Sequence, residues 1–218
     1  MDIGKSITYA FDDPDWVTKL LIGGVVNLVP IVNLAAVGYQ LRTLRRVAAN
    51  EERPLPDWHG FGGYFVKGLI ILAAGLIYAL PIALLAIIAL VVSAASGSAS
   101  SDAAGVVALC WSGVACFAAL YGIVVALWFP AALALYAVQG EFAAFFRFGE
   151  IWAFISRNLG GYVVVLLIVW VVGLVAATIG NIIPVIGAAF AGFWAMLVYA
   201  HLFGQLVREN GLTPVGGT

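Results

Sequence analysis

Two histidines are the residues of this sequence best suited to acid–base or metal chemistry. His59 closely follows Asp57 in a segment expected to be a loop. His201 stands near the end of a long apolar run, with Gln205 and Arg208 one and two turns farther along. No second His or Cys lies near it at metal-ligand spacing, and a lone histidine of this kind more often packs and forms hydrogen bonds than catalyses. We therefore expect no catalytic, metal or cofactor-binding site, no cofactor and no enzymatic activity.

The sequence also lacks motifs for phosphate or nucleic-acid binding. Gly60, Gly62 and Gly63 neither follow a strand nor lead to a P-loop lysine, so we interpret them as turn residues. The 10 basic and 11 acidic side chains nearly balance, and no basic stripe contains interleaved aromatic residues, which excludes nucleic acid as a partner. Cys110 and Cys116 would point about 240° apart on a helix, so they cannot bridge each other.

The composition indicates where such a chain resides. Of its 218 residues 64% are hydrophobic and 10% charged, and the mean hydropathy is +1.08. A soluble domain is about half apolar and about a quarter charged, and a water-soluble fold of this size could not cover so much apolar surface. We therefore expect a multi-pass protein of the cell membrane.

Three long stretches with few or no charges locate the membrane segments. Leu20–Leu41 and Asn158–Val207 contain no charged residue, and Gly68–Gly140 contains only Asp102. A helix needs about 20 residues to cross ~30 Å of hydrocarbon, so the two longer stretches must each turn back. Ser and Gly residues break the middle stretch, and turn residues at Asn181–Pro184 break the last. The predicted spans are 64–92, 106–139, 159–181 and 184–208, with an external loop at 93–105.

The first stretch contains Pro30 and allows two interpretations. Residues 16–49 form either a short or re-entrant hairpin of two helices or one span kinked at Pro30. A shift of 154 residues aligns this stretch with the last one, which favours a duplicated hairpin. The aligned pairs are Asn27 with Asn181, Pro30 with Pro184, Ile31 with Val185, Gly38 with Gly192, and Tyr39 with Phe193. We therefore expect an all-α polytopic transmembrane bundle of about six membrane helices.

The polar and proline residues of these two turns are candidate site residues. They could line a polar cavity where broken helices meet, as in transporters built from repeated halves. Alternatively, they cap the turns and satisfy the backbone groups that proline leaves free. The residues concerned are Asn27, Pro30, Asn33, Asn181 and Pro184.

The basic residues predict the orientation. With a hairpin at 16–49, all 10 of them lie on one side of the membrane. Since Lys and Arg are retained on the cytoplasmic face, the N-terminal segment 1–15 and the tail 209–218 are both expected in the cytoplasm. A single first span would instead place Lys5 and Lys19 outside. Three arginines at helical spacing either anchor a helix end at this face or bind one lipid head group. These arginines are Arg42, Arg45 and Arg46.

Aromatic and charged residues alternate between 141 and 158. This mixture is typical of the head-group level of a membrane, so we expect an interfacial amphipathic helix on the inner leaflet. The aromatic side chains either form an ordinary aromatic belt or contact the leaflet or a partner helix. The candidates for such a contact are Phe145, Phe146 and Trp152.

The first part of the chain resembles the prokaryotic family filed as domain of unknown function 4013. The resemblance rests on Asp12, Asp13, Trp16, Leu20–Gly24, Pro30, Asn33, Gly38, Tyr39, Arg42, Arg46, Glu51, Pro54–Pro56 and Trp58. It is specific over about residues 1–80 and diffuse beyond them. It implies a multi-spanning bacterial or archaeal membrane protein without an assigned activity, so no functional residues are carried over.

These observations predict one integral membrane domain, 1–218, without catalysis. The expected role is that of an interaction, scaffold or membrane-organising component. The alternative is a transporter or facilitator component for a small or lipid-like molecule, and a membrane-embedded enzyme ranks third. The expected partners are membrane lipids and either another membrane protein or a second copy of the chain.

Overall fold

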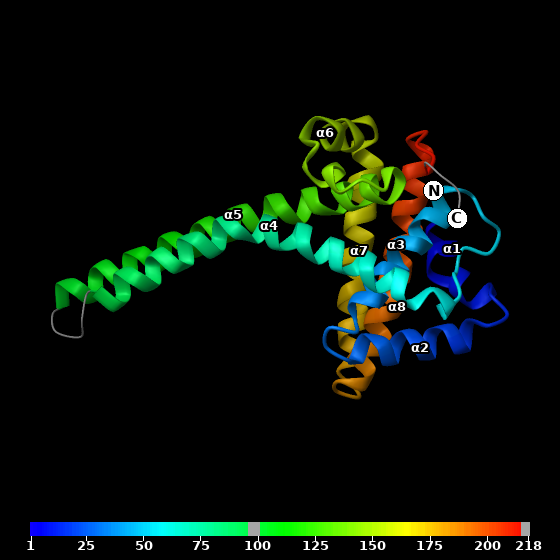
Figure 1. The fold of residues 1–218 in the computed structure, drawn as a ribbon, viewed down its shortest axis with the longest axis horizontal. Helices are drawn as coiled ribbons and strands as arrows, with labels where there is room; N and C mark the ends of the chain where they lie inside the picture. Colours follow the sequence, from blue (N-terminus) through cyan, green and yellow to red (C-terminus); the bar gives the residue numbers. More distant parts are fainter. Residues whose placement is uncertain (96–100, 215–218) are drawn as a thin grey trace. The chain divides into compact units, whose positions relative to one another are not determined.

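The computed structural model describes residues 1–95 and 101–214, and this part of the chain folds into helices and loops without a strand (Figure 1). The all-α prediction is therefore confirmed. The α-helices are α1 (Ile3–Thr8), α2 (Trp16–Leu28), α3 (Leu34–Ala48), α4 (Phe61–Ala95), α5 (Ser101–Gln139), α6 (Phe148–Arg157), α7 (Leu159–Gly180) and α8 (Ile186–Glu209), and the 3-10 helices are η1 (Tyr9–Asp12), η2 (Trp58–Gly60) and η3 (Phe142–Phe146).

Four helices are long and apolar enough to cross a membrane, judged by length and composition. They are α4, α5, α7 and α8, which coincide with the four predicted spans. Both ends of the external loop predicted at 93–105 are helical, because α4 continues to Ala95 and α5 begins at Ser101. The rest of that predicted loop, 96–100, lies outside the described residues.

The first stretch is a pair of short helices and not one kinked span. α2 has 13 residues and α3 has 15, and a turn at 29–33 separates them. α2 is apolar, whereas the second half of α3 carries the three arginines. Both helices are shorter than the about 20 residues that a full crossing requires.

The chain divides into two compact units, and the single integral membrane domain stays a prediction. The first unit comprises Met1–Leu72 and Ala131–Thr218, and the second comprises Ala73–Pro130. α4 and α5, with 35 and 39 residues, each contribute to both units, whereas α7 and α8, with 22 and 24 residues, belong to the first unit alone.

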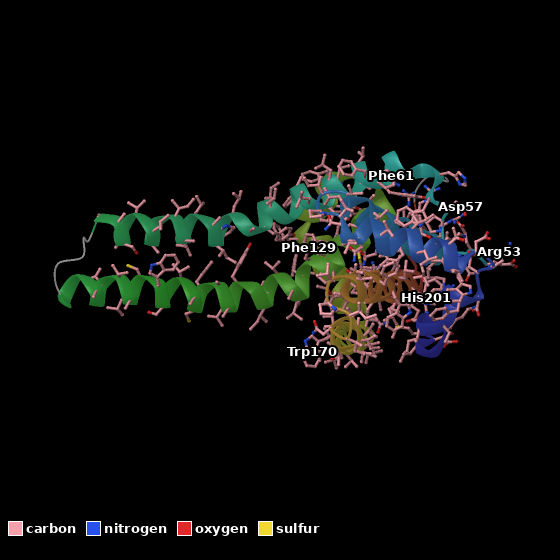
Figure 2. All side chains as sticks on the ribbon, turned by 90° about the horizontal axis from the view of Figure 1, so that it is seen from below. Arg53, Asp57, Phe61, Phe129, Trp170 and His201 are labelled. Carbon is pink, nitrogen blue, oxygen red and sulfur yellow. The ribbon has the colours of Figure 1, made fainter. Side chains whose placement is uncertain are left out.

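The second unit consists of the C-terminal part of α4 and the N-terminal part of α5, which contact each other. The Tyr121 hydroxyl donates to the Tyr78 carbonyl at 2.9 Å, and the Trp111 indole N–H donates to Ser93 Oγ at 3.0 Å. Its remaining side chains are almost all carbon, as Figure 2 shows, and Leu109 is 74% exposed. So large an exposed apolar surface suits lipid and not water.

In the first unit, α8 is the central helix and packs against α2, α3 and α7. Figure 1 shows α7 and α8 side by side, with α2 crossing them. Glycines on α2 permit the closest approach: a Cβ on Gly23 would lie 2.0 Å from the Phe193 ring, and one on Gly24 would lie 2.3 Å from the Phe190 ring. Two aromatic rings of α8 therefore rest directly on the backbone of α2.

The turns of the α2–α3 and α7–α8 hairpins share an unusual backbone conformation. Ile31 has φ 72° and Val185 has φ 71°, in the left-handed region that β-branched residues rarely adopt. Each follows a proline, and the shift of 154 residues aligns the two positions. Two such outliers at equivalent positions support the duplicated hairpin.

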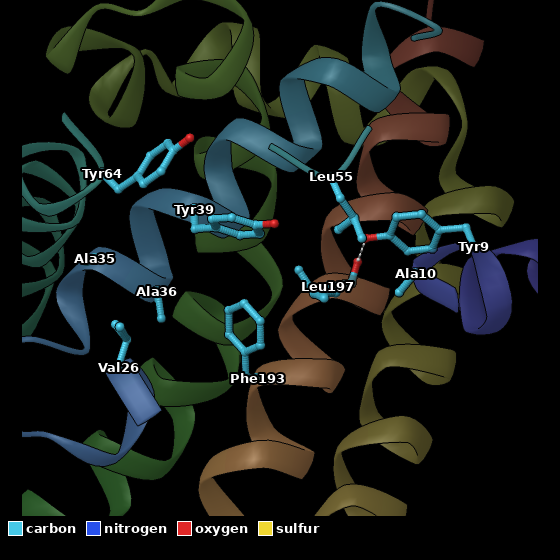
Figure 3. Close-up of a cluster of buried hydrophobic side chains, with 10 residues drawn as sticks. All are labelled: Tyr9, Ala10, Val26, Ala35, Ala36, Tyr39, Leu55, Tyr64, Phe193 and Leu197. Carbon is cyan, nitrogen blue, oxygen red and sulfur yellow. Dashed lines mark hydrogen bonds between the residues drawn. The ribbon is translucent and has the colours of Figure 1, made fainter. Parts of the chain in front are cut away.

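A buried aromatic cluster occupies the centre of the first unit. Tyr39 is fully buried, and its ring centroid lies 4.4 Å from that of Trp58, on which it stacks. Its hydroxyl donates to the Pro56 carbonyl at 2.7 Å, and burial raises its pKa, so it stays a neutral donor. Figure 3 shows Tyr39 beside Phe193, its partner in the repeat alignment, at a centroid separation of 5.6 Å.

The segment predicted as one interfacial helix at 141–158 is divided in two. η3 and α6 are separated at Arg147, whose φ of −81° and ψ of 71° are not helical. The Arg147 guanidinium pairs with Glu141, donates to Gln139 Oε1 at 3.1 Å, and lies 3.7 Å from Glu150. These contacts on both sides of Arg147 hold the bend, so the single straight helix is corrected to a 3-10 turn followed by a ten-residue helix.

Candidate functional site

A polar cavity of about 570 Å³ lies in the first unit. It is bounded by the start of the chain, by the loop that follows α3, and by the last turns of α8. Figure 2 shows two of its lining residues, Arg53 and His201, at the same side of this unit. Its charged side chains include Asp2, Lys5, Asp13, Glu51, Arg53 and Arg208. Because both signs of charge are mixed, the cavity favours neither an anion nor a cation.

His201 lines this cavity and belongs to a buried hydrogen-bond network. Its Nδ1 lies 2.8 Å from Ser6 Oγ and 2.8 Å from Gln205 Nε2, and the Tyr9 ring stacks on it at 4.2 Å. Ser6 is fully buried, so the Ser6–His201 pair cannot present a nucleophile to a substrate. The network instead joins α1 to α8.

The same region brings both ends of the described chain together. The N-terminal amine lies 2.6 Å from Glu209 Oε1, and the Asp2 backbone N–H donates to Gln205 Oε1 at 2.6 Å. Arg208 donates to Asn50, which lies just after α3. Sequence reasoning missed these contacts, because residues about 200 positions apart carry no local signal of their pairing.

A buried lysine holds the loop between α3 and α4. Lys19 Nζ lies 2.8 Å from Asp13 Oδ2 and 3.3 Å from Asp57 Oδ1, and it donates to the Leu55 carbonyl at 3.2 Å. The Trp58 indole donates to the Lys19 carbonyl at 3.1 Å. With its charge compensated and its donors used, Lys19 acts in folding. His59 lies beside this pair at a second cavity of about 430 Å³.

The asparagine and proline residues of the two turns pack or face outward. The Asn27 amide donates to the Ala189 carbonyl at 2.9 Å, which ties α2 to α8. Asn33 precedes α3 without a side-chain capping bond. Asn181, Pro30 and Pro184 are exposed. None of these five residues lines the two cavities described above, and the choice between a polar cavity and the turn-and-cap interpretation stays a prediction.

The three aromatic candidates occupy different environments. Phe145 is fully buried and stacks on Tyr136 at 4.8 Å, so it cannot make the outward contact predicted for it. Phe146 is half-buried. Trp152 is 61% exposed, as is its neighbour one turn earlier, Phe148, at 57%. Phe148 was not among the predicted contacts, although its i, i+4 spacing from Trp152 is a signal that could have found it. We call Phe148 and Trp152 the aromatic edge of α6.

The three arginines of α3 also occupy different environments. Arg46 Nε pairs with Glu51 at 2.7 Å, and its guanidinium also donates to the Leu55 carbonyl at 3.0 Å. Arg42 and Arg45 are half-buried, and burial, together with the charge of Arg42, lowers the pKa of Arg45. Arg46 is thus a structural residue, and the other two share a region of positive potential.

Within the described residues, no group of three or more His, Cys, Asp or Glu side chains is placed to hold a metal ion. The geometry therefore offers buried structural polar contacts, one mixed-charge cavity and an exposed aromatic edge.

Comparison with known proteins adds a family match. A family model described as "Protein of unknown function (DUF4013)" matches residues 22–185, which is about three quarters of the chain. The match extends well beyond the residues that carry the resemblance in the sequence, and it begins after Asp12, Asp13 and Trp16. No curated protein and no solved structure matches the chain.

Proposed function

This chain belongs to the DUF4013 family, and from that premise we propose that it is a non-catalytic component of the cell membrane that acts by contact. Its apolar helices hold it in the bilayer, and its role is that of an interaction, scaffold or membrane-organising protein. The aromatic edge of α6 makes the contact, and the surface it engages is the inner leaflet of the membrane.

The observation that carries this proposal is the apolar face of α6, which is wider than the part of it that is buried. Ile151, Phe154 and Ile155 of this ten-residue helix are buried, while Phe148 and Trp152 are exposed. At helical spacing these five residues form one apolar face, of which the first unit covers one side and leaves Phe148 and Trp152 uncovered at the edge. An apolar edge left exposed on a helix with charged side chains near both ends fits the boundary between head groups and acyl chains.

The contacts near the chain ends support a cytoplasmic location for both termini. Met1 pairs with Glu209, and Arg208 donates to Asn50, so the start of the chain and the ends of α3 and α8 lie together. α6 leads directly into α7, whose first residues lie beside the last turns of α8 in the antiparallel hairpin. Because basic residues are retained on the cytoplasmic face, this end of the first unit belongs there.

The use of the polar side chains supports a role without catalysis. Ser6, His201 and Gln205 satisfy one another, and Lys19 is fully engaged by Asp13 and its other partners. The transporter alternative receives no specific support, since the residues of the asparagine and proline turns are used in packing or exposed.

A depth measurement tests the contact with the leaflet. After Cys110→Ser and Cys116→Ser, a nitroxide label is placed at residue 152 through Trp152→Cys, and the protein is reconstituted in vesicles. We expect the label to collide more often with oxygen than with a water-soluble nickel reagent. A label placed through Glu52→Cys, on an exposed loop, provides the water-facing control. Equal nickel accessibility at 152 and 52 would contradict the proposal.

A flux assay tests the absence of transport. Vesicles containing the protein should show no movement of small solutes or labelled lipids above that of empty vesicles. Flux that Asn181→Leu abolishes would replace our proposal with the transporter alternative.

A further inference from the structure

α3 and α4 cross with their backbones in contact at two glycines. Ideal Cβ atoms on Gly38 and Gly68 would lie 1.8 Å and 1.9 Å from carbonyl oxygens of the opposite helix. This contact sets the register of the two helices, since neither can slide past the other without a steric clash. It also fixes the positions of Lys67, which precedes Gly68, and of Arg42, one turn after Gly38.

Three cations gather next to this crossing, and we call Arg42, Arg45 and Lys67 the cation cluster. All three are half-buried. The positive charges of Arg42 and Arg45 act on the Lys67 ammonium, and that of Arg42 acts on Arg45. Like charges held together in a partly buried site destabilise the fold unless an anion compensates them.

The described residues supply no such anion to two members of the cluster. Neither Arg42 nor Lys67 has an ion-pair or hydrogen-bond partner within that part of the chain. Two acids of the loop between α3 and α4 are used in other ion pairs, because Glu51 pairs with Arg46 at 2.7 Å and Asp57 lies 3.3 Å from Lys19. An anion that pairs with these two side chains therefore lies outside the described residues.

The sequence places the cluster at the edge of the apolar segments. Arg42 directly follows the charge-free stretch Leu20–Leu41, and Lys67 directly precedes Gly68–Gly140, whose only charge is Asp102. Cationic side chains at such a boundary lie at the level of the lipid phosphates.

We propose that Arg42 and Lys67, with Arg45 beside them, bind a phosphate group at the membrane surface. A guanidinium presents paired N–H donors to two phosphate oxygens, and a lysine adds a point charge. The ligand class is a phosphate compound of net negative charge, supplied either by the head group of an acidic phospholipid or by a soluble phosphate compound. This site is separate from the aromatic edge and does not depend on the proposed function.

Thermal unfolding in nanodiscs tests the site. The full-length protein is compared in discs of phosphatidylcholine alone and in discs that also contain phosphatidylglycerol. We expect the anionic lipid to raise the Tm by about 2–4 °C. The double variant Arg42→Gln/Lys67→Gln should lose this rise. The matched control Lys5→Gln/Arg53→Gln, which removes the same charge from two exposed residues, should keep it.

The proposal also predicts that the double variant has a raised Tm in phosphatidylcholine discs, which a merely structural role of the two side chains would not produce. In phosphatidylcholine discs, where the cluster has no anionic lipid, Arg42→Gln/Lys67→Gln should unfold at a higher Tm than the unmodified protein, because repulsion is removed. The charge-preserving variant Arg42→Lys/Lys67→Arg should keep the response to phosphatidylglycerol.

Inorganic phosphate added to phosphatidylcholine discs separates the two sources. A rise in Tm with phosphatidylglycerol alone identifies a lipid head group, whereas a rise with free phosphate that the double variant abolishes identifies a soluble phosphate compound. Three results would overturn the proposal: equal Tm of the unmodified protein under all three conditions, a double variant that keeps the rise, or a double variant that is less stable in phosphatidylcholine.

Discussion

The two units of this protein obtain their stability in different ways. In the first unit, glycines bring helices into contact at Gly38 and Gly68, and polar side chains are used in buried bonds. In the second unit, Gly75, Gly113 and Gly122 have no atom within 4 Å of an added Cβ, and large apolar side chains are exposed. The first unit thus depends on its internal packing, whereas the second leaves most of its surface for lipid to cover.

The largest contrast is expected between matched glycine substitutions. Gly38→Val places a side chain 1.8 Å from a backbone oxygen of α4, so the helices must separate, and we expect a loss of more than about 4 kcal/mol in the free energy of unfolding. Gly122→Val meets open space and should change the free energy of unfolding by less than about 1 kcal/mol. Denaturant unfolding in detergent measures both. Similar losses would break the distinction between the units.

The second-largest contrast is expected between a buried and an exposed ion pair. Lys19→Met leaves Asp13, which is 6% exposed, without its partner, and removal of one member of a buried pair costs about 3 kcal/mol or more. Arg147→Met breaks an exposed pair with Glu141 and should cost less than about 1 kcal/mol. The same unfolding assay compares them, and a tolerant Lys19→Met would show that lipid or water compensates Asp13.

Two serines provide a smaller contrast across the units. Ser6 is fully buried and bonds to Asp2, His201 and Gln205, so Ser6→Ala should cost about 2 kcal/mol by leaving polar groups unsatisfied. Ser93→Ala removes an exposed bond from Trp111 and should cost about 0.5 kcal/mol or less. If the order were reversed, the second unit would depend on its polar contacts more than the first unit does.

The smallest contrast concerns two tyrosine hydroxyls. Tyr39→Phe removes a fully buried bond to the Pro56 carbonyl, and we expect a cost of about 1–1.5 kcal/mol. Tyr121→Phe removes a part-buried bond to the Tyr78 carbonyl and should cost about half as much. A shift of Tm in the two purified variants measures the difference, which disappears if both hydroxyls are equally solvated.

The sequence predicted the long helices well, because charge-free stretches and the turn residues that interrupt them mark where such helices lie. The charge-free stretch that begins at Asn158 predicted a span at 159–181, and α7 covers Leu159–Gly180. The repeat alignment correctly favoured a pair of helices at 16–49, and the shared φ of Ile31 and Val185 supports the duplication.

The packing between distant segments could not be predicted. An alternation of aromatic and charged residues does not distinguish the buried Phe145 from the exposed Trp152, because both belong to the same composition. The buried pairing of Ser6 with His201 and the separation of Arg46 from Arg42 depend on which segments meet in space. One sequence alone does not contain that information.

The length of α4 has a consequence for the membrane itself. Its charge-free part, Gly68–Ala95, is roughly 42 Å long at the rise of an α-helix, whereas the hydrocarbon core is about 30 Å thick. Such a helix fits if it tilts, if it kinks, for which Pro81 inside α4 provides a position, or if the bilayer thickens around it. Hydrophobic mismatch of this kind sorts proteins among membranes of different thickness, so the length of α4 favours a thicker bilayer over a thinner one.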